Sequence, residues 1–467
     1  MNRSGDVGKR LSATNKNTPL NNPETEQQTH LPYTSASQPD DNVSDSSQKP
    51  DVFLVWVCNA EQNYATITIN KIRNTSIMIL AIKHRLTYFL LAAGFFFAAA
   101  NVAQAGIDFP NKFEWHSVSP EQAGFSPEKL DVAVRLAIRN TVLEPNDLHQ
   151  VLLDSYAPKE HNYRVLGPTK PRKTPAGMVL KSGKVVASWG DTQRVDMTFS
   201  VVKSYLSTLV GIALRDGLIK SVHDPVVNYV QDGKFDSDKN RVITWHHLMQ
   251  QTSDWQGTLW DTPDWADRPV GDSLEEWKSR TLYPAGTHFK YNDVRVNLLA
   301  YALLQVFREP LPVVLKREVM DKIGASSTWR WHGYENSWVT LDGMKIQSVS
   351  GGGHFGGGLF INTEDHARFG LLFLNQGKVG ETQVLPEGWT KRVRVPTDVR
   401  PDYGYMWWLN TQNSISKAPE SAYFAAGFGG NYIYVDEENE LVIVLRWIPN
   451  MAEVINAFLE AQVALVN

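Results

Sequence analysis

Apolar and polar positions divide the chain into a polar beginning and a long globular remainder. Residues 1–50 are rich in Asn, Gln, Ser, Thr and Pro, and one short apolar stretch, residues 52–58, follows them. A segment of this composition buries too little apolar surface to become ordered. We therefore expect residues 1–77 to be disordered and the rest of the chain to form the fold.

A basic start, an apolar run and small residues follow one another directly after this polar segment. Met78 precedes two basic residues, residues 88–100 are apolar, and Ala-Gln-Ala occupies residues 103–105. This layout is typical of a secretory signal peptide, which we expect at residues 78–105. A membrane anchor is the alternative, but the apolar run is shorter than the ~20 residues that span a bilayer.

Signal peptides lie at an N-terminus, so this position indicates that translation starts at Met78 and that residues 1–77 are a start-site artefact. The mature protein is then expected to begin at Gly106, in the periplasm or outside the cell, without stable insertion into the membrane. The single cysteine, Cys58, lies before this point. Neither disulfides nor thiol chemistry are therefore expected in the mature protein.

The first half of the mature chain carries clear helix and strand signals. Ser126 before a proline predicts a capped helix that ends near residue 138. Residues 178–189 are typical of two strands joined by a Ser-Gly turn. An apolar helix is predicted over residues 200–216, because Gly217 ends the pattern.

The second half predicts further elements in the same way. These are helices at 294–307 and 311–323, a strand at 359–361, a helix capped by Thr363 that ends near residue 375, strands at 431–435 and 441–447, and a C-terminal helix. Strands lie near both ends of the mature chain and helices lie between them. We therefore expect one α/β sheet assembled from both termini around a helical middle.

Composition narrows the functional classes. The chain has 467 residues, of which 42% are hydrophobic and 21% charged, and 46 Lys and Arg stand against 50 Asp and Glu. This is the composition of a globular protein. Because no basic block occurs, nucleic acid is not expected as a partner.

Several common catalytic motifs are absent from the sequence. It contains no His-Glu-x-x-His, Gly-x-Ser-x-Gly or P-loop pattern, and no Gly-x-Gly-x-x-Gly between a strand and a helix. The 12 histidines are scattered, and His246 and His247 are adjacent rather than at a helical metal-binding spacing. No metal site is predicted.

Ser-x-x-Lys places a hydroxyl and an amine one helical turn apart, and one of its occurrences opens an apolar helix. That pair is Ser200 and Lys203; the others are Ser46/Lys49, Ser126/Lys129 and Ser414/Lys417. Burial of the helix would lower the pKa of Lys203 and let it act as a base. The N–H groups at the helix start suit an oxyanion that develops next to Ser200. A capping serine and a lysine that reaches to solvent are the alternative.

The surroundings of this pair resemble the penicillin-recognising serine hydrolases, the β-lactamase-related family of class C β-lactamases, D-aminopeptidases, esterases and 6-aminohexanoate-dimer hydrolases. In that family the nucleophilic serine and its lysine open a buried helix after a strand pair, as Ser200 and Lys203 do here. Residues 243–253 are similar to the family's ITxxHLLxxTSG stretch. The resemblance covers roughly residues 120–460. It implies a β-lactamase/transpeptidase-like fold, an antiparallel sheet flanked by helices, within a domain at 106–467 whose helical insertion region spans about 220–345.

The family's second and third motifs also have counterparts. A Tyr-x-Asn motif precedes a helix in the family, and Tyr291-Asn-Asp293 is similar in placement, although Asp293 stands where the family usually has Asn. A literal Tyr-x-Asn begins at Tyr334, which we expect in a Trp- and His-rich loop and therefore disfavour. The third motif, Lys/His-Thr/Gly-Gly on a strand, has its counterpart in Phe428-Gly429-Gly430-Asn431.

The resemblance implies catalysis through an acyl-enzyme. Ser200 would attack an ester or amide carbonyl after losing its proton to Lys203 or Tyr291, and the sequence does not decide between these two. The N–H groups of Ser200 and Asn431 would hold the oxyanion, and Tyr291 would protonate the leaving group. No metal or organic cofactor is needed.

The walls of the pocket bear on the substrate, which we expect to be a small-molecule ester or amide. Phe428 replaces the cationic or imidazole side chain that helps to bind an anionic group, which weakens the β-lactamase interpretation. Asp293, Trp331 and Trp407 are the other expected pocket residues, since tryptophans can wall an apolar acyl pocket, although core packing is an equal alternative for each tryptophan.

Several functions stay open within and beyond this family. An amidase resembling the 6-aminohexanoate-dimer hydrolases, or an esterase, is favoured over a β-lactamase or a D-amino-acid peptidase. A domain that binds a ligand without turnover is the alternative from another class. The sequence does not determine the oligomeric state.

Overall fold

A computed structural model describes residues 107–143 and 145–463. The expected disordered segment, residues 1–77, and the expected signal peptide, residues 78–105, lie outside the described residues, as does Gly106. The described residues belong to one compact unit, Phe96–Asn467.

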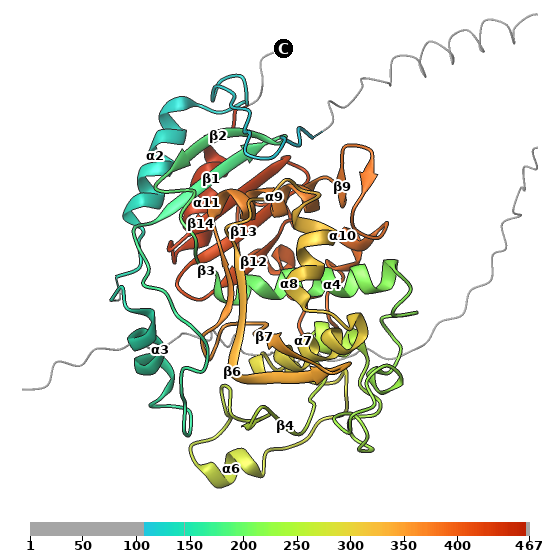
Figure 1. The fold of residues 1–467 in the computed structure, drawn as a ribbon. Coiled ribbons are helices and arrows are strands. Elements are labelled where there is room, and N and C mark those ends of the chain that lie inside the picture. Colours follow the sequence, from blue (N-terminus) through green and yellow to red (C-terminus); the bar gives the residue numbers. More distant parts are fainter. Residues whose placement is uncertain (1–106, 144, 464–467) are drawn as a thin grey trace, which may run out of the picture. The chain divides into compact units, whose positions relative to one another are not determined.

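The main sheet has six antiparallel strands that come from both ends of the described chain (Figure 1). Its order is β11-β12-β13-β14-β1-β2. In chain order the strands are β1 (Ala176–Lys181), β2 (Lys184–Trp189), β11 (Trp408–Leu409), β12 (Tyr423–Gly427), β13 (Asn431–Asp436) and β14 (Leu441–Arg446). Strand β1 pairs with β14, so the early hairpin completes a sheet of late strands. The predicted α/β sheet built from both termini is confirmed.

The hairpin of β1 and β2 turns at the predicted dipeptide. Ser182 and Gly183 have φ values of 50° and 87°. Positive φ at both central residues is what a type I′ turn requires, and this turn matches the natural twist of two antiparallel strands.

Helices cover both faces of the main sheet, and the alternation of side chains along β14 explains why. Ile443 and Leu445 belong to one core with α2 (Pro127–Arg139) and α11 (Met451–Ala461). Val442 and Val444 belong to the other core, which includes α9 (Thr363–Leu374). Successive residues of a strand point to opposite faces, so β14, which is buried throughout, holds both layers together.

The caps of two of these helices test the predictions directly. Ser126 caps α2 as expected, because its side chain accepts the N–H of Lys129. The predicted cap of α9 is wrong by one position: Asn362 is the N-cap, and its side chain accepts the N–H of Asp365. Asn is as good an acceptor at this position as Thr, so the sequence pattern alone did not separate them.

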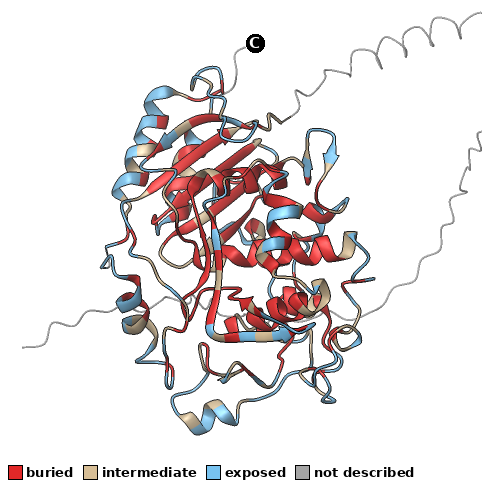
Figure 2. Cartoon of the chain, in the orientation of Figure 1, coloured by how far each residue is buried: buried red, intermediate tan, exposed pale blue. Residues whose placement is uncertain are grey.

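Two buried helices lie beside the main sheet. A 3-10 turn (Phe199–Val201) leads into α4 (Val202–Arg215), and α4 packs against α7 (Asp293–Phe307). Figure 2 shows both helices largely buried, in agreement with their apolar sequences. After α7 come α8 (Leu311–Leu315) and a π-helical turn (Lys316–Met320).

A second antiparallel sheet has the order β3-β8-β6-β7. Its strands are β3 (Asp196–Met197), β6 (Arg330–Leu341), β7 (Met344–Val349) and β8 (Gly358–Ile361). Strands β6 and β7 lie at the end of the expected helical region and were not predicted. Tyr334 therefore lies in a strand rather than in a loop; the register of β6 against β7 shifts between Gly333 and Trp338, which breaks the simple alternation.

The remaining elements are short. They are α3 (Leu148–Tyr156), α5 (Trp245–Met249), α6 (Leu274–Lys278), α10 (Trp389–Arg392), the 3-10 turns Val226–Asn228 and Asn410–Gln412, and the hairpins β4 (Thr258–Leu259) with β5 (Thr262–Pro263) and β9 (Lys378–Val379) with β10 (Thr382–Gln383).

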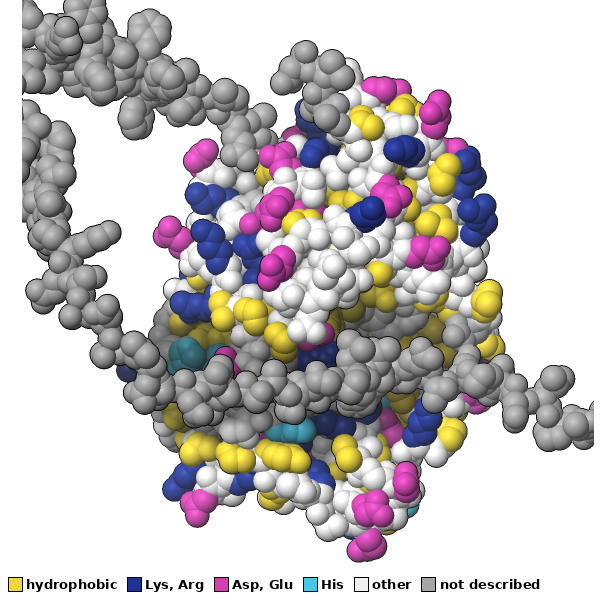
Figure 3. All heavy atoms as spheres, turned by 180° about the vertical axis from the view of Figure 1, so that it is seen from behind, with side chains coloured by type: hydrophobic (Ala, Val, Ile, Leu, Met, Phe, Trp, Pro, Cys, Tyr) yellow, Lys and Arg dark blue, Asp and Glu magenta, His cyan; other side chains and the backbone are white. Residues whose placement is uncertain are grey.

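Within residues 107–143 and 145–463, no individual helix is long and apolar enough to cross a membrane. The helix pair Asp293–Phe307 and Leu311–Met320, which is bent by 76°, has this length and apolar character only when its two helices are taken together. On the face seen from behind in Figure 3, acidic and basic side chains are interspersed.

Candidate active site

Ser200 lies in the 3-10 turn that begins the buried helix α4, immediately after a residue with unusual backbone geometry. Phe199 has φ of 48°, a left-handed conformation that costs energy in a residue with a side chain. Ser200 itself is partly exposed, whereas its neighbours Phe199 and Val201 are buried. The turn therefore presents one hydroxyl at the surface of an otherwise buried segment.

Lys203 follows one turn later and points back to this hydroxyl. Its Nζ lies 2.7 Å from Ser200 Oγ, and the residue is 1% exposed. The predicted pairing of these two side chains is thus present in the structure. Burial lowers the pKa of Lys203, because it removes water from the ammonium form, and the nearby carboxylate of Asp293 opposes this effect.

Tyr291 completes the set from the loop that leads into α7. Its hydroxyl lies close enough to the Ser200 side chain for that side chain to affect its pKa, and the Nζ of Lys203 lies 4.6 Å from the centre of its ring. Burial raises the pKa of Tyr291, and the charge of Asp293 adds to this rise. Tyr291 therefore keeps its proton at neutral pH.

Tyr334, the alternative tyrosine, lies elsewhere in the hydrogen-bond network. Its hydroxyl accepts from Asn297 at 3.1 Å and from Ser350 at 3.0 Å. It is 2% exposed. Tyr291 rather than Tyr334 is therefore the tyrosine next to Ser200. Tyr334 links Asn297 of α7 to Ser350.

Asp293, at the start of α7, forms a buried ion pair with Lys203. Its Oδ1 lies 2.7 Å from Lys203 Nζ, and its Oδ2 accepts the N–H of His354 at 3.1 Å. Burial works against ionisation of Asp293, but the charges of Lys203 and Arg268 outweigh it and hold the pKa at about 2. Because Asp293 stands where the family usually has Asn, a carboxylate rather than an amide contacts Lys203.

A glycine is required where this ion pair meets the loop before β8. A side chain on Gly352 would place its Cβ against the carboxylate of Asp293 and 2.5 Å from Lys203 Nζ. The carbonyl of Gly352 lies 3.5 Å from Ser200 Oγ, and the Gly351 N–H donates to Asn297 at 2.8 Å. The loop is thus held close to the catalytic set by hydrogen bonds that its N–H groups donate to side chains of α7.

The segment predicted as the third motif borders Ser200. A Cβ built on Gly427, the last residue of β12, would lie 3.2 Å from the backbone N of Ser200. Gly429 and Gly430 follow with φ of 75° and 80°, which favours glycine at both positions. Asn431 is fully buried opposite Gly427, and its side chain donates to the carbonyl of Phe428 at 2.8 Å.

The aromatic residues predicted as pocket walls divide into two groups. The ring of Phe428 is partly exposed and lies 5.2 Å from the ring of Phe199. Trp407 is fully buried and packs on Phe373 at 4.7 Å. Trp331 is 5% exposed and donates its indole N–H to a backbone carbonyl. Both tryptophans are buried in the core, which was the stated alternative to their role as pocket walls.

Other aromatic groups lie beside the catalytic set instead. Trp408, next in sequence to Trp407, stacks on Tyr291 with ring centres 5.9 Å apart and is partly exposed. Tyr156, from α3, lies 6.1 Å from Phe428. A two-residue period along the strand would have indicated that adjacent tryptophans face opposite sides.

Arg268 is a functional candidate that the sequence reasoning missed. Its guanidinium lies 4.0 Å from Asp293 and 5.4 Å from the ring centre of Tyr291. It also forms an ion pair with the buried Asp267 at 2.6 Å. Nothing in the local pattern marks Arg268, because it comes from an irregular loop.

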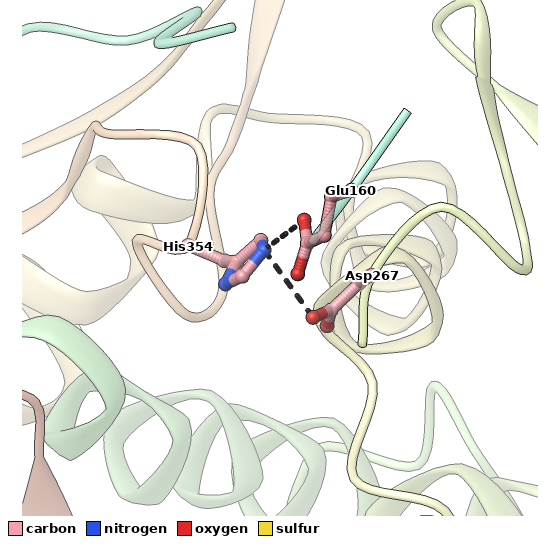
Figure 4. Close-up of side chains that lie close together, drawn as sticks. All are labelled: Glu160, Asp267 and His354. Atoms are coloured by element: carbon pink, nitrogen blue, oxygen red, sulfur yellow. Dashed lines mark hydrogen bonds and ion pairs between the residues drawn. The ribbon is translucent and has the colours of Figure 1, made fainter. Parts of the chain in front are cut away.

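The ion pair with Asp267 connects this arginine to a buried cluster of one histidine and two carboxylates (Figure 4). His354 Nε2 lies 2.8 Å from Glu160 and 3.3 Å from Asp267. Among the described residues, these three form the group whose ligand atoms all lie within 4.8 Å of one another, as metal binding requires. Here the hydrogen bonds to His354 and the Arg268 ion pair already satisfy the carboxylates, and His354 is tied through its backbone to Asp293.

One family model and several solved structures resemble the chain. The family model named Beta-lactamase matches residues 138–461. Solved structures that resemble the chain include a protein assigned as a 6-aminohexanoate-dimer hydrolase from Bacillus anthracis (16% identity, 76% of this chain and 89% of that chain, TM-score 0.45). A second is a beta-lactamase from Mycobacterium bovis (16% identity, 68% of this chain and 100% of that chain, TM-score 0.44). A third is an octameric penicillin-binding protein homologue from Pyrococcus abyssi (15% identity, 62% of this chain and 74% of that chain, TM-score 0.46). No curated protein sequence matches.

The matched region includes all three catalytic candidates as well as the segment that borders Ser200. It begins in α2 and ends with α11, so it takes in both layers around the main sheet. The match extends over more than half of the sequence. The chain therefore belongs to the beta-lactamase family.

Proposed function

We propose that the protein is a serine hydrolase that cleaves an ester or amide bond through an acyl-enzyme on Ser200. The observation that carries this proposal is the joint contact of one partly exposed hydroxyl with a buried lysine at 2.7 Å and with a tyrosine hydroxyl. A nucleophile in contact with a base and a second proton-carrying group is what nucleophilic catalysis needs.

The proton roles follow from the charges around Lys203. Burial drives Lys203 toward the neutral amine, which can take the proton of Ser200. Asp293 then stabilises the resulting ammonium from 2.7 Å. Tyr291, which burial keeps protonated, is placed to donate a proton to the leaving group and to regain one from the Lys203 ammonium; water then attacks the acyl-enzyme, and the released Ser200 recovers its proton. We therefore assign Lys203 as the base and Tyr291 as the acid.

The oxyanion would be held by backbone N–H groups. One is the N–H of Ser200, and the second must come from the chain that borders it. Gly427 is close to Ser200, and Asn431 is paired with Gly427 across the turn. The predicted donor is Asn431; Phe428 is the alternative, because it follows Gly427 directly.

An amidase or esterase is favoured over a β-lactamase or a D-amino-acid peptidase. Phe428 packs on Phe199 and supplies no charge for a carboxylate next to the scissile bond. Arg446 is 2% exposed and donates to the backbone carbonyls of Ile361 and Met197, so it does not reach this surface either. A carboxylate packed against Phe428 would lose its water without a cationic partner from Phe428 or Arg446, whereas a neutral acyl group gains from burial there.

A substrate panel tests this proposal. The wild type should hydrolyse p-nitrophenyl butyrate or a linear amide with higher kcat/KM than nitrocefin, and Ser200→Ala should remove all these activities. A protein that binds these compounds but turns none over would instead be the binding domain considered as the alternative.

For localisation we propose the periplasm or the extracellular space, on the basis of the signal-peptide pattern at residues 78–105. N-terminal sequencing of protein recovered from the periplasm should give Gly106. Folded protein that begins at Met1 or Met78 would contradict this.

A further inference from the structure

A cavity lies next to Arg268. It has a volume of about 420 Å³ and is lined by the loop 264–271, by α6 and by residues 279–295. Arg268 lines this cavity and also approaches the ring of Tyr291 to 5.4 Å. Arg268 therefore connects the lining of the cavity to the catalytic set.

Four cations, Arg268, Arg280, Lys290 and Arg295, line this cavity together with three buried carboxylates. The carboxylates are Asp254, Asp264 and Asp267, and their ion pairs are with Lys239, Arg268, Arg280 and Arg295. Glu276 also lines the cavity, but it is exposed and accepts the N–H of Asp272.

Lys290 is a further cation in the lining, and its charge is not balanced by a carboxylate. Its Nζ donates to the backbone carbonyl of Arg268, and among the described residues it forms no ion pair. Burial and the charges of Arg295 and Arg268 lower its pKa, against the opposing effect of Asp267. An anion next to Lys290 would stabilise its charged form against this burial.

Arg295 is a buried cation in the lining of the same cavity. It is 3% exposed, and its Nε and Nη1 have no hydrogen-bond partner, while its Nη2 pairs with Asp254 at 2.8 Å. A buried guanidinium with two unpartnered nitrogens has N–H donors that a polar ligand group could satisfy.

Two tryptophans supply an apolar wall opposite these charges. Trp265 and Trp277 lie with ring centres 6.3 Å apart, and both are partly exposed and line the cavity. Trp277 donates its indole N–H to the carbonyl of Gly271 at 2.8 Å, which fixes the ring. Large aromatic surfaces next to a few charged groups are typical of small-molecule sites.

We propose that this cavity binds an organic anion with one carboxylate and an apolar or aromatic body, its carboxylate at Lys290 and Arg268 and its body against the exposed faces of Trp265 and Trp277. The anion is either the distal end of the substrate or a separate ligand. Binding itself does not depend on the proposed catalytic function; the assignment to the substrate does.

Isothermal titration with 4-phenylbutyrate tests the site, and 4-phenylbutanol serves as the uncharged match. The acid should bind about 10-fold or more tighter than the alcohol, the scale of a hydrogen bond to a charged group. Lys290→Gln should remove this preference, whereas Lys129→Gln, an exposed lysine on α2, should retain it. Trp277→Ala, on the exposed helix α6, should weaken both compounds and provides a second variant if Lys290→Gln does not fold.

Kinetics with p-nitrophenyl butyrate separate the two sources of the carboxylate. If 4-phenylbutyrate raises KM in a competitive manner, and an ester with a distal carboxylate is a better substrate than its methyl-capped form, the cavity holds the end of the substrate. If 4-phenylbutyrate binds without competing, the ligand is separate. Equal binding of acid and alcohol, or a preference unchanged in both variants, would overturn the proposal even if Ser200 is the nucleophile.

Discussion

Replacing Asp293 with asparagine isolates the electrostatic contribution of the buried ion pair. Asn has the same shape but carries no charge and has one acceptor oxygen, whereas Asp293 uses one oxygen for Lys203 and the other for the N–H of His354. In the proposed mechanism the neutral amine of Lys203 is the base, so activity is lost at low pH as the amine takes up a proton. Asp293 favours the protonated form, so its removal should lower the pKa of Lys203.

The size of this effect follows from the distance. Two unit charges 2.7 Å apart interact by about 6 kcal/mol at an effective dielectric constant of 20. Since one pKa unit corresponds to about 1.4 kcal/mol, even a quarter of this interaction moves the titration by about one unit. The acidic limb of kcat/KM against pH should therefore lie at least about one pH unit lower in Asp293→Asn than in the wild type.

The assay is the pH dependence of kcat/KM for p-nitrophenyl butyrate. Asp342→Asn is the matched control, because Asp342 forms an exposed ion pair with Arg308 and lies in a turn. The control should show the wild-type profile. An acidic limb of Asp293→Asn that stays in place, or moves to higher pH, would refute the role of Lys203 as the titrating base.

Three further substitutions test other parts of the site. Tyr291→Phe should lower kcat about 10²-fold or more, whereas Tyr334→Phe should mainly cost stability, about 1–3 kcal/mol by chemical denaturation; the reverse result would show that the second motif is assigned to the wrong tyrosine. Gly352→Ala should reduce kcat about 10-fold or more, because the added Cβ displaces Lys203. Gly380→Ala, whose added Cβ meets no neighbouring atom, should leave kcat unchanged. Full activity of Gly352→Ala would show that the loop moves aside without disturbing Lys203. Phe428→Lys should move the kcat/KM ratio of nitrocefin to p-nitrophenyl butyrate toward nitrocefin, and an unchanged ratio would show that Phe428 does not set this preference.

Local signals were sufficient for the elements whose pattern and ends are encoded within a few residues. The hairpin at Ser182-Gly183 and the helix capped by Ser126 were predicted because a turn and a cap each depend on neighbouring residues alone. The strand β6 was not predicted, because its pairing with β7 shifts register and its polar residues break the alternation. Tertiary pairing rather than local preference stabilises it.

The site was predictable where the sequence itself brings the groups together. Ser200 and Lys203 lie one helical turn apart, so their contact follows from helix geometry. Glu160, Arg268 and His354 come from three separate loops, and their proximity arises from the fold. Trp407 shows a further limit, since an aromatic residue near a site gives no local sign of whether it faces the core or the cleft.

Covalent labelling of the mature protein tests the central claim most directly. After incubation with a fluorophosphonate, intact-mass and peptide mass spectrometry should find one adduct per chain, on the peptide that contains Ser200. Ser200→Ala should take up no label and melt at nearly the same temperature as the wild type. An adduct on another residue, or labelling of Ser200→Ala equal to that of the wild type, would contradict the assignment of Ser200 as the nucleophile.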